Sequence, residues 1–207
     1  MGKNDGPSLF NAIAPVYALF YHRQKKFYHQ ILQKVSPEVD LHSLGSVLDV
    51  GCGPGALCAA LHERGIPVTG VEPAEKMLER AKRRPEHSGI SFIKADVLRG
   101  LPFADNAFDV SIACYVAHGL APAQRQRMYR EMRRVSRKLV ILHDFNQRRS
   151  PLTSLIEWLE RGDYFRFILV AQKEMKNCVQ DMKLCFSSVR VIDVDKRAAW
   201  YVCTPGE

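Results

Sequence analysis

Val47-Leu-Asp-Val-Gly51-Cys-Gly53-Pro-Gly55-Ala56 is the stretch that decides the fold of this 207-residue chain. A short, mainly apolar run leads directly into a turn in which glycine occupies three alternate positions. Glycine adopts backbone angles that other residues avoid and lets a ligand approach where a Cβ would collide, and a following helix directs free N–H groups at that ligand. The stretch therefore predicts a buried strand that feeds a nucleotide-type cofactor loop.

Two cofactor classes use such a loop, and the glycine spacing alone does not separate them. Gly51, Gly53 and Ala56 also satisfy the loose dinucleotide pattern G-x-G-x-x-A. Asp49 separates the two classes by charge, because a carboxylate two residues before the first glycine would repel the pyrophosphate of a dinucleotide. S-adenosylmethionine (SAM) presents an ammonium and a sulfonium instead. The charge balance favours SAM.

Length and composition predict one soluble domain. A chain with 46% hydrophobic content has enough apolar residues for a single packed core. The first residues are polar and no run of about eighteen apolar residues occurs, so a cytoplasmic location without a leader or a membrane span is expected. Six cysteines are scattered without a C-x-x-C pair, which predicts reduced thiols and no metal site.

The net charge of +8 raises the alternative of a nucleic-acid partner. The basic residues gather at 23–26, 80–84 and 125–138. Each stretch has helical periodicity, as in the apolar stripe of Met128 and Met132, and no aromatic residues interleave for base stacking. Solvated helix faces are therefore favoured over a nucleic-acid site, while an acidic small molecule or an anionic lipid surface stays open as a partner.

Helical stretches and short apolar runs alternate after the glycine loop, which indicates parallel strands with helices on both faces of the sheet. Two β-rich runs near the C-terminus are predicted to form an antiparallel hairpin. The expected strands lie at 46–50, 67–71, 90–94, 108–114 and 138–143, and the hairpin at 188–194 and 198–203. The predicted fold class is α/β: a doubly wound Rossmann-like sheet of five parallel strands plus the hairpin, in one domain over residues 1–207 with a helical cap over residues 1–40.

This combination of sheet and glycine motif resembles the class I SAM-dependent methyltransferases. Asp49-Val-Gly-Cys-Gly-Pro-Gly55 is similar to the first motif of that family, and the similarity extends from about residue 10 to about residue 203. Phe10–Tyr17 resembles the helical cap of the small-molecule methyltransferases of quinone biosynthesis. The resemblance implies transfer of a methyl group from SAM to a small-molecule acceptor by in-line displacement, with release of S-adenosylhomocysteine (SAH).

Glu72 is the predicted partner of the cofactor ribose. It ends the second expected strand, 23 residues after Asp49, about where an acidic residue accepts hydrogen bonds from ribose hydroxyls. The resemblance implies that Met77 forms an apolar wall against the adenine and that Asp96 accepts the adenine amino group. A strand-end glutamate, a core methionine and a surface aspartate are the structural alternatives. The predicted cofactor-binding residues are Tyr17, Tyr21, Asp49, Gly51, Cys52, Gly53, Glu72, Pro73, Met77, Asp96, Val97 and Ala113.

Tyr17 and Tyr21 lie four residues apart and share one face of the N-terminal helical stretch. Aromatic rings attract cations, so one interpretation is that these rings close over the sulfonium of bound SAM. The other interpretation is that they belong, with Phe10 and Phe20, to an apolar stripe that packs on the sheet. A second aromatic cluster at Asp163–Phe167 indicates a planar or apolar acceptor.

Candidate catalytic residues follow the fourth and fifth strands, whose carboxyl ends line the crevice of such a sheet. His118 aligns with a histidine common in the family, and it either polarises the substrate or caps the next helix. His143 and Asp144 end the fifth strand, where a histidine with a near-neutral pKa takes a substrate proton. Neighbouring strand residues face opposite sides of a sheet, so at most one of this pair acts in the site. Tyr115, His118 and His143 are the predicted catalytic residues.

The segment after the fourth strand also excludes several acceptors. Methyltransferases of DNA-base amino groups and glutamine amides resemble one another in an Asn/Asp/Ser-Pro-Pro-Tyr signature there, and cytosine C5 enzymes carry a Pro-Cys dipeptide; this chain has neither. Two alternatives stay open. A SAM-binding or RNA-associated protein without transferase activity would bind SAM without turnover. An NAD-dependent oxidoreductase would carry an apolar residue at position 49 and a Tyr-x-x-x-Lys pair.

Overall fold

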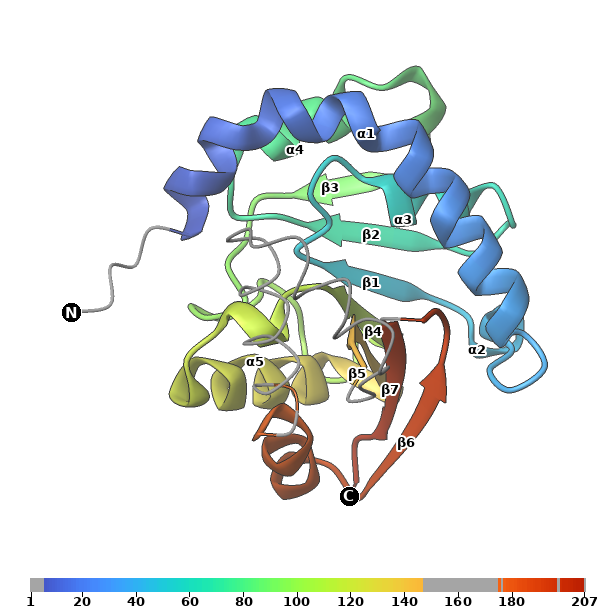
Figure 1. Cartoon of the computed structure of the whole chain (residues 1–207), viewed down its shortest axis with the longest axis vertical. Helices are drawn as coiled ribbons and strands as arrows, with labels where there is room; N and C mark the ends of the chain where they lie inside the picture. The colour runs from blue at the N-terminus through green and yellow to red at the C-terminus, as the bar shows by residue number, and fades with distance from the viewer. Residues whose placement is uncertain (1–5, 147–174, 176, 197, 207) are drawn as a thin grey trace, which may run out of the picture.

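The computed structural model describes residues 6–146, 175, 177–196 and 198–206. Its centre is a seven-stranded sheet in the order β3-β2-β1-β4-β5-β7-β6 (Figure 1). β1 to β5 run parallel, and β7 runs antiparallel to both β5 and β6. The strands are β1 (Val47–Val50), β2 (Val68–Val71), β3 (Ser91–Ile93), β4 (Phe108–Cys114), β5 (Ser136–Phe145), β6 (Ser188–Asp193) and β7 (Ala198–Thr204). The predicted parallel sheet with its C-terminal hairpin is confirmed.

Helices cover both faces of this sheet (Figure 1). Two of them, α1 and α3, pack on one face, and α5 packs on the other. Val47 lies in the core beside α1 and Leu48 in the core beside α5, since successive strand residues face opposite sides. Burial on both sides is why the strands read as nearly continuous apolar runs. The helices are α1 (Gly6–Val35), α2 (Leu41–Leu44), α3 (Ala56–His62), α4 (Glu75–Lys82) and α5 (Pro122–Val135), with short 3₁₀ turns η1 (Pro85–His87) and η2 (Ala117–Gly119).

Gly70 allows the glycine loop that follows β1 to pack closely on β2. A Cβ at this position would lie 2.8 Å from the Cys52 sulfur, 2.8 Å from the Phe92 ring and 3.0 Å from the Cys58 sulfur. Those distances are shorter than van der Waals contact, so any larger residue would push the loop and α3 away from the strand. The close packing of β2 thus fixes the height of the loop above the sheet.

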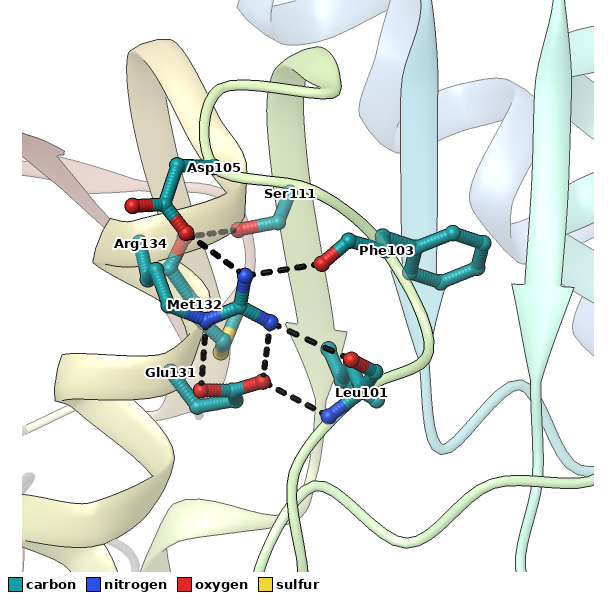
Figure 2. Close-up of polar contacts among 7 residues, drawn as sticks. All are labelled: Leu101, Phe103, Asp105, Ser111, Glu131, Met132 and Arg134. Carbon is teal, nitrogen blue, oxygen red and sulfur yellow. Dashed lines mark hydrogen bonds and ion pairs between the residues drawn. The ribbon is translucent and has the colours of Figure 1, made fainter.

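Arg134 near the end of α5 holds the loop between β3 and β4 against that helix (Figure 2). Its guanidinium donates all five of its N–H groups: two to backbone carbonyl oxygens of the loop, one to Asp105 and two to Glu131. Glu131 in turn accepts the backbone N–H of Leu101 at 2.6 Å. Two charged side chains therefore bond backbone groups of this loop, which directly follows residues 95–99 at the carboxyl edge of the sheet.

Arg134→Lys is expected to lower the free energy of unfolding by about 1–3 kcal/mol, because lysine has three donors in place of five and cannot form the planar fork to Glu131. Urea denaturation followed by circular dichroism measures the change. Arg130→Lys on the same helix is the matched control. Arg130 is exposed and donates to Gln126, so this variant should stay within about 0.5 kcal/mol of the wild type. Equal losses in the two variants would contradict the role assigned to Arg134.

Candidate functional site

A pocket of about 510 Å³ opens at the carboxyl ends of β1, β2 and β4. Gly51 and Pro73 line one side of it, residues 95–99 a second side, and Val116 with the first turns of α5 a third. The strand order reverses between β1 and β4, and open α/β sheets bind their ligands at such a point. The pocket has the volume of a site for a small organic ligand or cofactor.

The glycine loop has backbone angles in the left-handed region, where glycine is favoured. The φ angle is +74° at Gly51, +54° at Gly53 and +83° at Gly55. A Cβ on Gly51 would lie 3.1 Å from the side chain of Val116, which also lines the pocket. A Cβ on Gly55 would lie 2.7 Å from the His87 ring. The predicted loop is therefore present between β1 and α3, and its first glycine lines the pocket at a position where a side chain would press on Val116.

Glu72 fastens the glycine loop to the start of α4. Its carboxylate accepts the backbone N–H of Gly53 at 3.0 Å and that of Ala74 at 2.8 Å. Burial raises the pKa of Glu72, and the two backbone N–H groups oppose that rise. A carboxylate offers about four acceptor positions, so these bonds leave room for ribose hydroxyls. Glu72 lies between Val71 and Pro73, both of which line the pocket, and contact with the ribose stays a prediction.

Asp49 lies beneath the glycine loop, on the side of α3, and does not line the pocket. It is 1% exposed, and the Cys58 thiol donates to its carboxylate at 3.1 Å. Burial raises the pKa of Asp49 to about 7; the Cys58 hydrogen bond lowers it and the charge of Glu72 raises it. A buried carboxylate of this kind is costly to ionise until a cation approaches it.

Four predicted cofactor residues come together in the pocket wall, namely Gly51, Pro73, Asp96 and Val97. Asp96 forms a turn there: one carboxylate oxygen accepts the Leu98 N–H at 2.9 Å, and the other lies 3.6 Å from the Arg99 guanidinium. Three further predicted residues, Cys52, Gly53 and Ala113, do not line the pocket, although Cys52 directly follows the lining residue Gly51.

Tyr21 and Met77 are packing residues in the structure. Tyr21 is fully buried, its hydroxyl hydrogen-bonds His87 Nε2 at 2.6 Å, and the Arg84 guanidinium lies 3.4 Å from its ring centroid. The interpretation that Tyr21 closes over the cofactor is therefore wrong, because its ring and hydroxyl already have these partners. Met77 is 1% exposed and packs with Ala14 outside the pocket lining, so it is a core residue here and not a wall of the site. The side chain of Tyr17 lies outside the described residues.

Several lining residues are missing from the sequence analysis. Leu98 directly follows the predicted pair Asp96 and Val97, so extending that motif by one residue finds it. Phe10, Gln124 and Arg127 reach the pocket from α1 and α5. No local pattern reveals them, because their place depends on how these helices cross the carboxyl edge of the sheet.

His118 and Asp144 form a hydrogen-bonded pair at the rim of the pocket. His118 lies in η2, between the lining residues Val116 and Gly119. Its Nδ1 donates to one Asp144 oxygen at 2.8 Å, and its backbone N–H donates to the other at 3.2 Å. Asp144 is 1% exposed, and a carboxylate on Nδ1 places the lone pair of the neutral ring on Nε2. In this arrangement a carboxylate orients a histidine for proton transfer.

His143 faces the opposite side of β5, as the alternation of strand residues requires. It is fully buried, and its Nδ1 accepts the indole N–H of Trp200 at 2.9 Å. Burial lowers the pKa of His143 to about 4, against the opposing charges of Asp144 and Asp195. Its lone pair is already engaged by Trp200, so the predicted role of His143 as a proton acceptor is wrong.

Tyr115 stands between the two histidines. Its ring centroid lies 4.7 Å from that of His143 and 5.4 Å from that of Phe145, and Phe145 lies 5.0 Å from His118. Its φ angle of +57° is unusual for a bulky residue, and such strain of about 1–3 kcal/mol persists where surrounding contacts enforce it. The four rings form an aromatic row across the carboxyl ends of β4 and β5.

Three remaining expectations concern metals, membranes and the second aromatic cluster. Within the described ranges, no three His, Cys, Asp or Glu side chains are placed to hold a metal ion. None of the helices in those ranges combines the length and apolar character of a membrane span. The aromatic cluster at 163–167 lies outside the described residues.

Comparison with known proteins finds methyltransferases. The family described as methyltransferase domain matches residues 47–138. The chain is 34% identical over 124 residues to a phosphatidylethanolamine N-methyltransferase of Cereibacter sphaeroides, covering 56% of this chain and 59% of that protein. It is 33% identical over 109 residues to a malonyl-[acyl-carrier protein] O-methyltransferase of Pseudescherichia vulneris, covering 50% of this chain and 42% of that protein. The chain thus spans about half the length of these relatives.

A solved structure shows the same fold over the whole chain. A Methanococcus maripaludis protein assigned as an S-adenosyl-L-methionine-dependent methyltransferase aligns with a TM-score of 0.70 at 18% identity, over 100% of this chain and 98% of that chain. This similarity in fold agrees with the methyltransferase-domain match. It also agrees with the position of the glycine loop, which lies where the strand order of the sheet reverses. The matched domain, the methyltransferase relatives and this fold together support a class I SAM-dependent methyltransferase, with SAM as the cofactor.

Proposed function

We propose that this protein transfers the methyl group of SAM to a small-molecule acceptor. SAM occupies the pocket at the carboxyl ends of β1, β2 and β4, and the acceptor lies over β4 and β5. One observation carries the proposal: the glycine loop opens the pocket on one side, and the His118–Asp144 pair stands at its rim on another. A cofactor site and a candidate proton acceptor are thus adjacent.

The bound cofactor supplies a methyl group on a good leaving sulfur, so the chain has to position the acceptor, exclude water and hold one proton. His118 is the residue placed for that proton. Asp144 accepts the Nδ1–H and so keeps the basic lone pair on Nε2, and its charge stabilises the imidazolium that forms when Nε2 takes the proton of the acceptor. Tyr115 contacts His143 and Phe145 in the aromatic row and provides a surface on which the acceptor packs.

The role of His118 in taking a proton limits which acceptor atoms fit the proposal. The names of the two relatives point to different atoms, a nitrogen in one and an oxygen in the other. A proton acceptor at the rim is useful only where the attacking atom still carries a proton at neutral pH, as a hydroxyl or an ammonium does. The proposal therefore favours a hydroxyl or amine acceptor over a carboxylate or a thiolate.

Calorimetric titration with SAM, SAH and NADH in one buffer tests the cofactor. Micromolar binding of SAM and SAH, without binding of NADH, is the expected result; binding of NADH would support the oxidoreductase alternative. SAM binding without methylation of any acceptor in a screen of hydroxyl and amine compounds would support the binding protein without transferase activity.

Two glycine variants locate the site in the same experiment. Gly51→Ala should abolish SAM binding, because the new methyl group enters the pocket towards Val116. Gly65→Ala is the matched control: Gly65 has a similar φ of +73°, and nothing lies within 4 Å of a Cβ there. The control carries the same backbone strain and should bind SAM like the wild type. Equal loss of binding in both variants would contradict the pocket assignment.

A further inference from the structure

The Nε2 atom of His143 has no hydrogen-bond partner among the described residues, although the side chain is fully buried. Nδ1 of the same ring accepts the indole N–H of Trp200 at 2.9 Å. Indole nitrogen is a donor only, so Nδ1 carries no proton and the proton of the neutral ring is on Nε2. A buried donor without an acceptor destabilises the folded protein, and a bound ligand that accepts its hydrogen bond would recover that cost.

This donor lies close to where the acceptor of methyl transfer belongs. His143 lies two residues before the end of β5 and is the register neighbour of Cys114 in β4. β4 in turn pairs with β1, which leads into the glycine loop. Adjacent strands are about 4.8 Å apart, so His143 lies about 10 Å from that loop across the carboxyl edge. Burial raises the pKa of Tyr28 and of Cys114, and the charge of Asp49 raises both further.

Aromatic rings surround the donor. The ring centroids of Tyr115, Phe27 and Tyr28 lie 4.7, 6.1 and 6.1 Å from that of His143, all in edge-to-face orientation. Aromatic walls favour a planar ring, which stacks or meets them edge-on. An N–H group directed at the face of an aromatic ring makes only a weak hydrogen bond, which compensates only part of the cost of burying the donor. The surroundings therefore suit a planar ligand that carries a hydrogen-bond acceptor.

We propose that His143 is a specificity-determining donor of the acceptor site, whose Nε2–H binds an oxygen atom of a planar aromatic acceptor packed among Phe27, Tyr28 and Tyr115. This inference rests on the proposed methyl transfer and names its substrate class. The two histidines have different roles because their Nδ1 atoms have different hydrogen-bond partners. His118 donates from Nδ1 to a carboxylate and keeps a basic Nε2, whereas His143 accepts at Nδ1 from an indole and keeps a donating Nε2.

Calorimetric titration of the SAH-loaded protein with 2-naphthol and 2-methylnaphthalene tests the inference. The two compounds have the same ring and nearly the same shape, and they differ in a hydroxyl against a methyl group. The wild type should bind 2-naphthol about tenfold more tightly, the effect of one hydrogen bond to a buried donor. Equal affinities, or no binding of either compound, would overturn the inference. SAH binding is measured first, and its failure would defeat the proposed function instead.

Two variants assign the preference to His143. His143→Phe removes the donor and should bind both compounds equally, whereas His143→Gln keeps an amide donor and an oxygen for Trp200 and should retain a preference for 2-naphthol. SAH affinity should be unchanged in both, because His143 does not line the cofactor pocket. Thermal unfolding confirms that each variant is folded, and the wild-type comparison stands if the phenylalanine variant is not. A preference that survives in folded His143→Phe would overturn the inference.

Discussion

We expect His118→Asn to lower the rate of methyl transfer by about 10²–10⁴-fold and to leave SAM affinity unchanged. The asparagine amide still donates to Asp144, so the variant removes the basic nitrogen and keeps the neighbouring contact. Single-turnover transfer from labelled SAM to an acceptor that the wild type methylates measures the rate of the chemical step. Calorimetry with SAH measures cofactor binding separately, so a loss of catalysis is distinguished from a loss of the pocket.

Asp144→Asn should reduce the rate through the same nitrogen. An asparagine can donate to Nδ1 of His118, which moves the proton of the neutral ring to Nε2 and removes the basic lone pair from the site. His42→Asn is the matched control, because His42 is an exposed histidine in α2 and should be replaceable without effect. A full rate in His118→Asn would show that the acceptor reaches the site already deprotonated, and the pair would then have no part in proton transfer.

The sheet follows from the sequence because its strands are buried on both faces and its turns are marked by glycine and proline. The runs at 47–50 and 108–114 are mainly apolar, and a charged turn separates the two strands of the hairpin. These are local signals, and the structure reproduces them within two residues, with the largest differences at the two ends of β5. There the strand begins at Ser136, directly after α5, with no connecting residue between helix and strand.

The chemical roles of side chains depended on partners far away in the sequence. Tyr21 meets His87 across 66 residues, and His143 meets Trp200 across 57 residues. No periodicity predicts either contact, and each one reverses the role assigned from the local pattern. The pairing of Asp144 with His118 likewise needs β4 and β5 to lie side by side before two separate motifs become one pair.

We expect Asp49→Asn to have two large effects: it should stabilise the ligand-free protein, and it should weaken SAM binding. Asp49 is 1% exposed, and burial raises its pKa from 3.8 to about 7. Folding therefore favours the protonated form. That contribution to stability is complete below the unfolded pKa of about 4 and is lost as pH rises through about 7.

At about pH 8 the wild type carries this charge, and the neutral asparagine variant should be more stable by up to about 4 kcal/mol. At about pH 4 the advantage should disappear, since Asp49 is then protonated as well. Urea denaturation of both proteins at the two pH values measures the difference. Glu79→Gln is the control: Glu79 is an exposed carboxylate in α4, and its neutralisation should leave stability within about 0.5 kcal/mol at both pH values. A stability difference that does not change with pH would contradict the raised pKa.

The same buried charge gives SAM binding its pH dependence. A cation held above the glycine loop stabilises ionised Asp49, so binding lowers its pKa and releases a proton when the titration is done near pH 7. SAM should therefore bind about tenfold more weakly at about pH 6 than at about pH 8, and calorimetry in two buffers of different ionisation enthalpy should detect the proton release. Asp49→Asn should weaken binding at about pH 8 by about 1–3 kcal/mol and lose both the pH dependence and the proton release. If the variant binds SAM like the wild type at both pH values, the carboxylate does not sense the cofactor, and the attraction that separates SAM from a dinucleotide must come from elsewhere in the pocket.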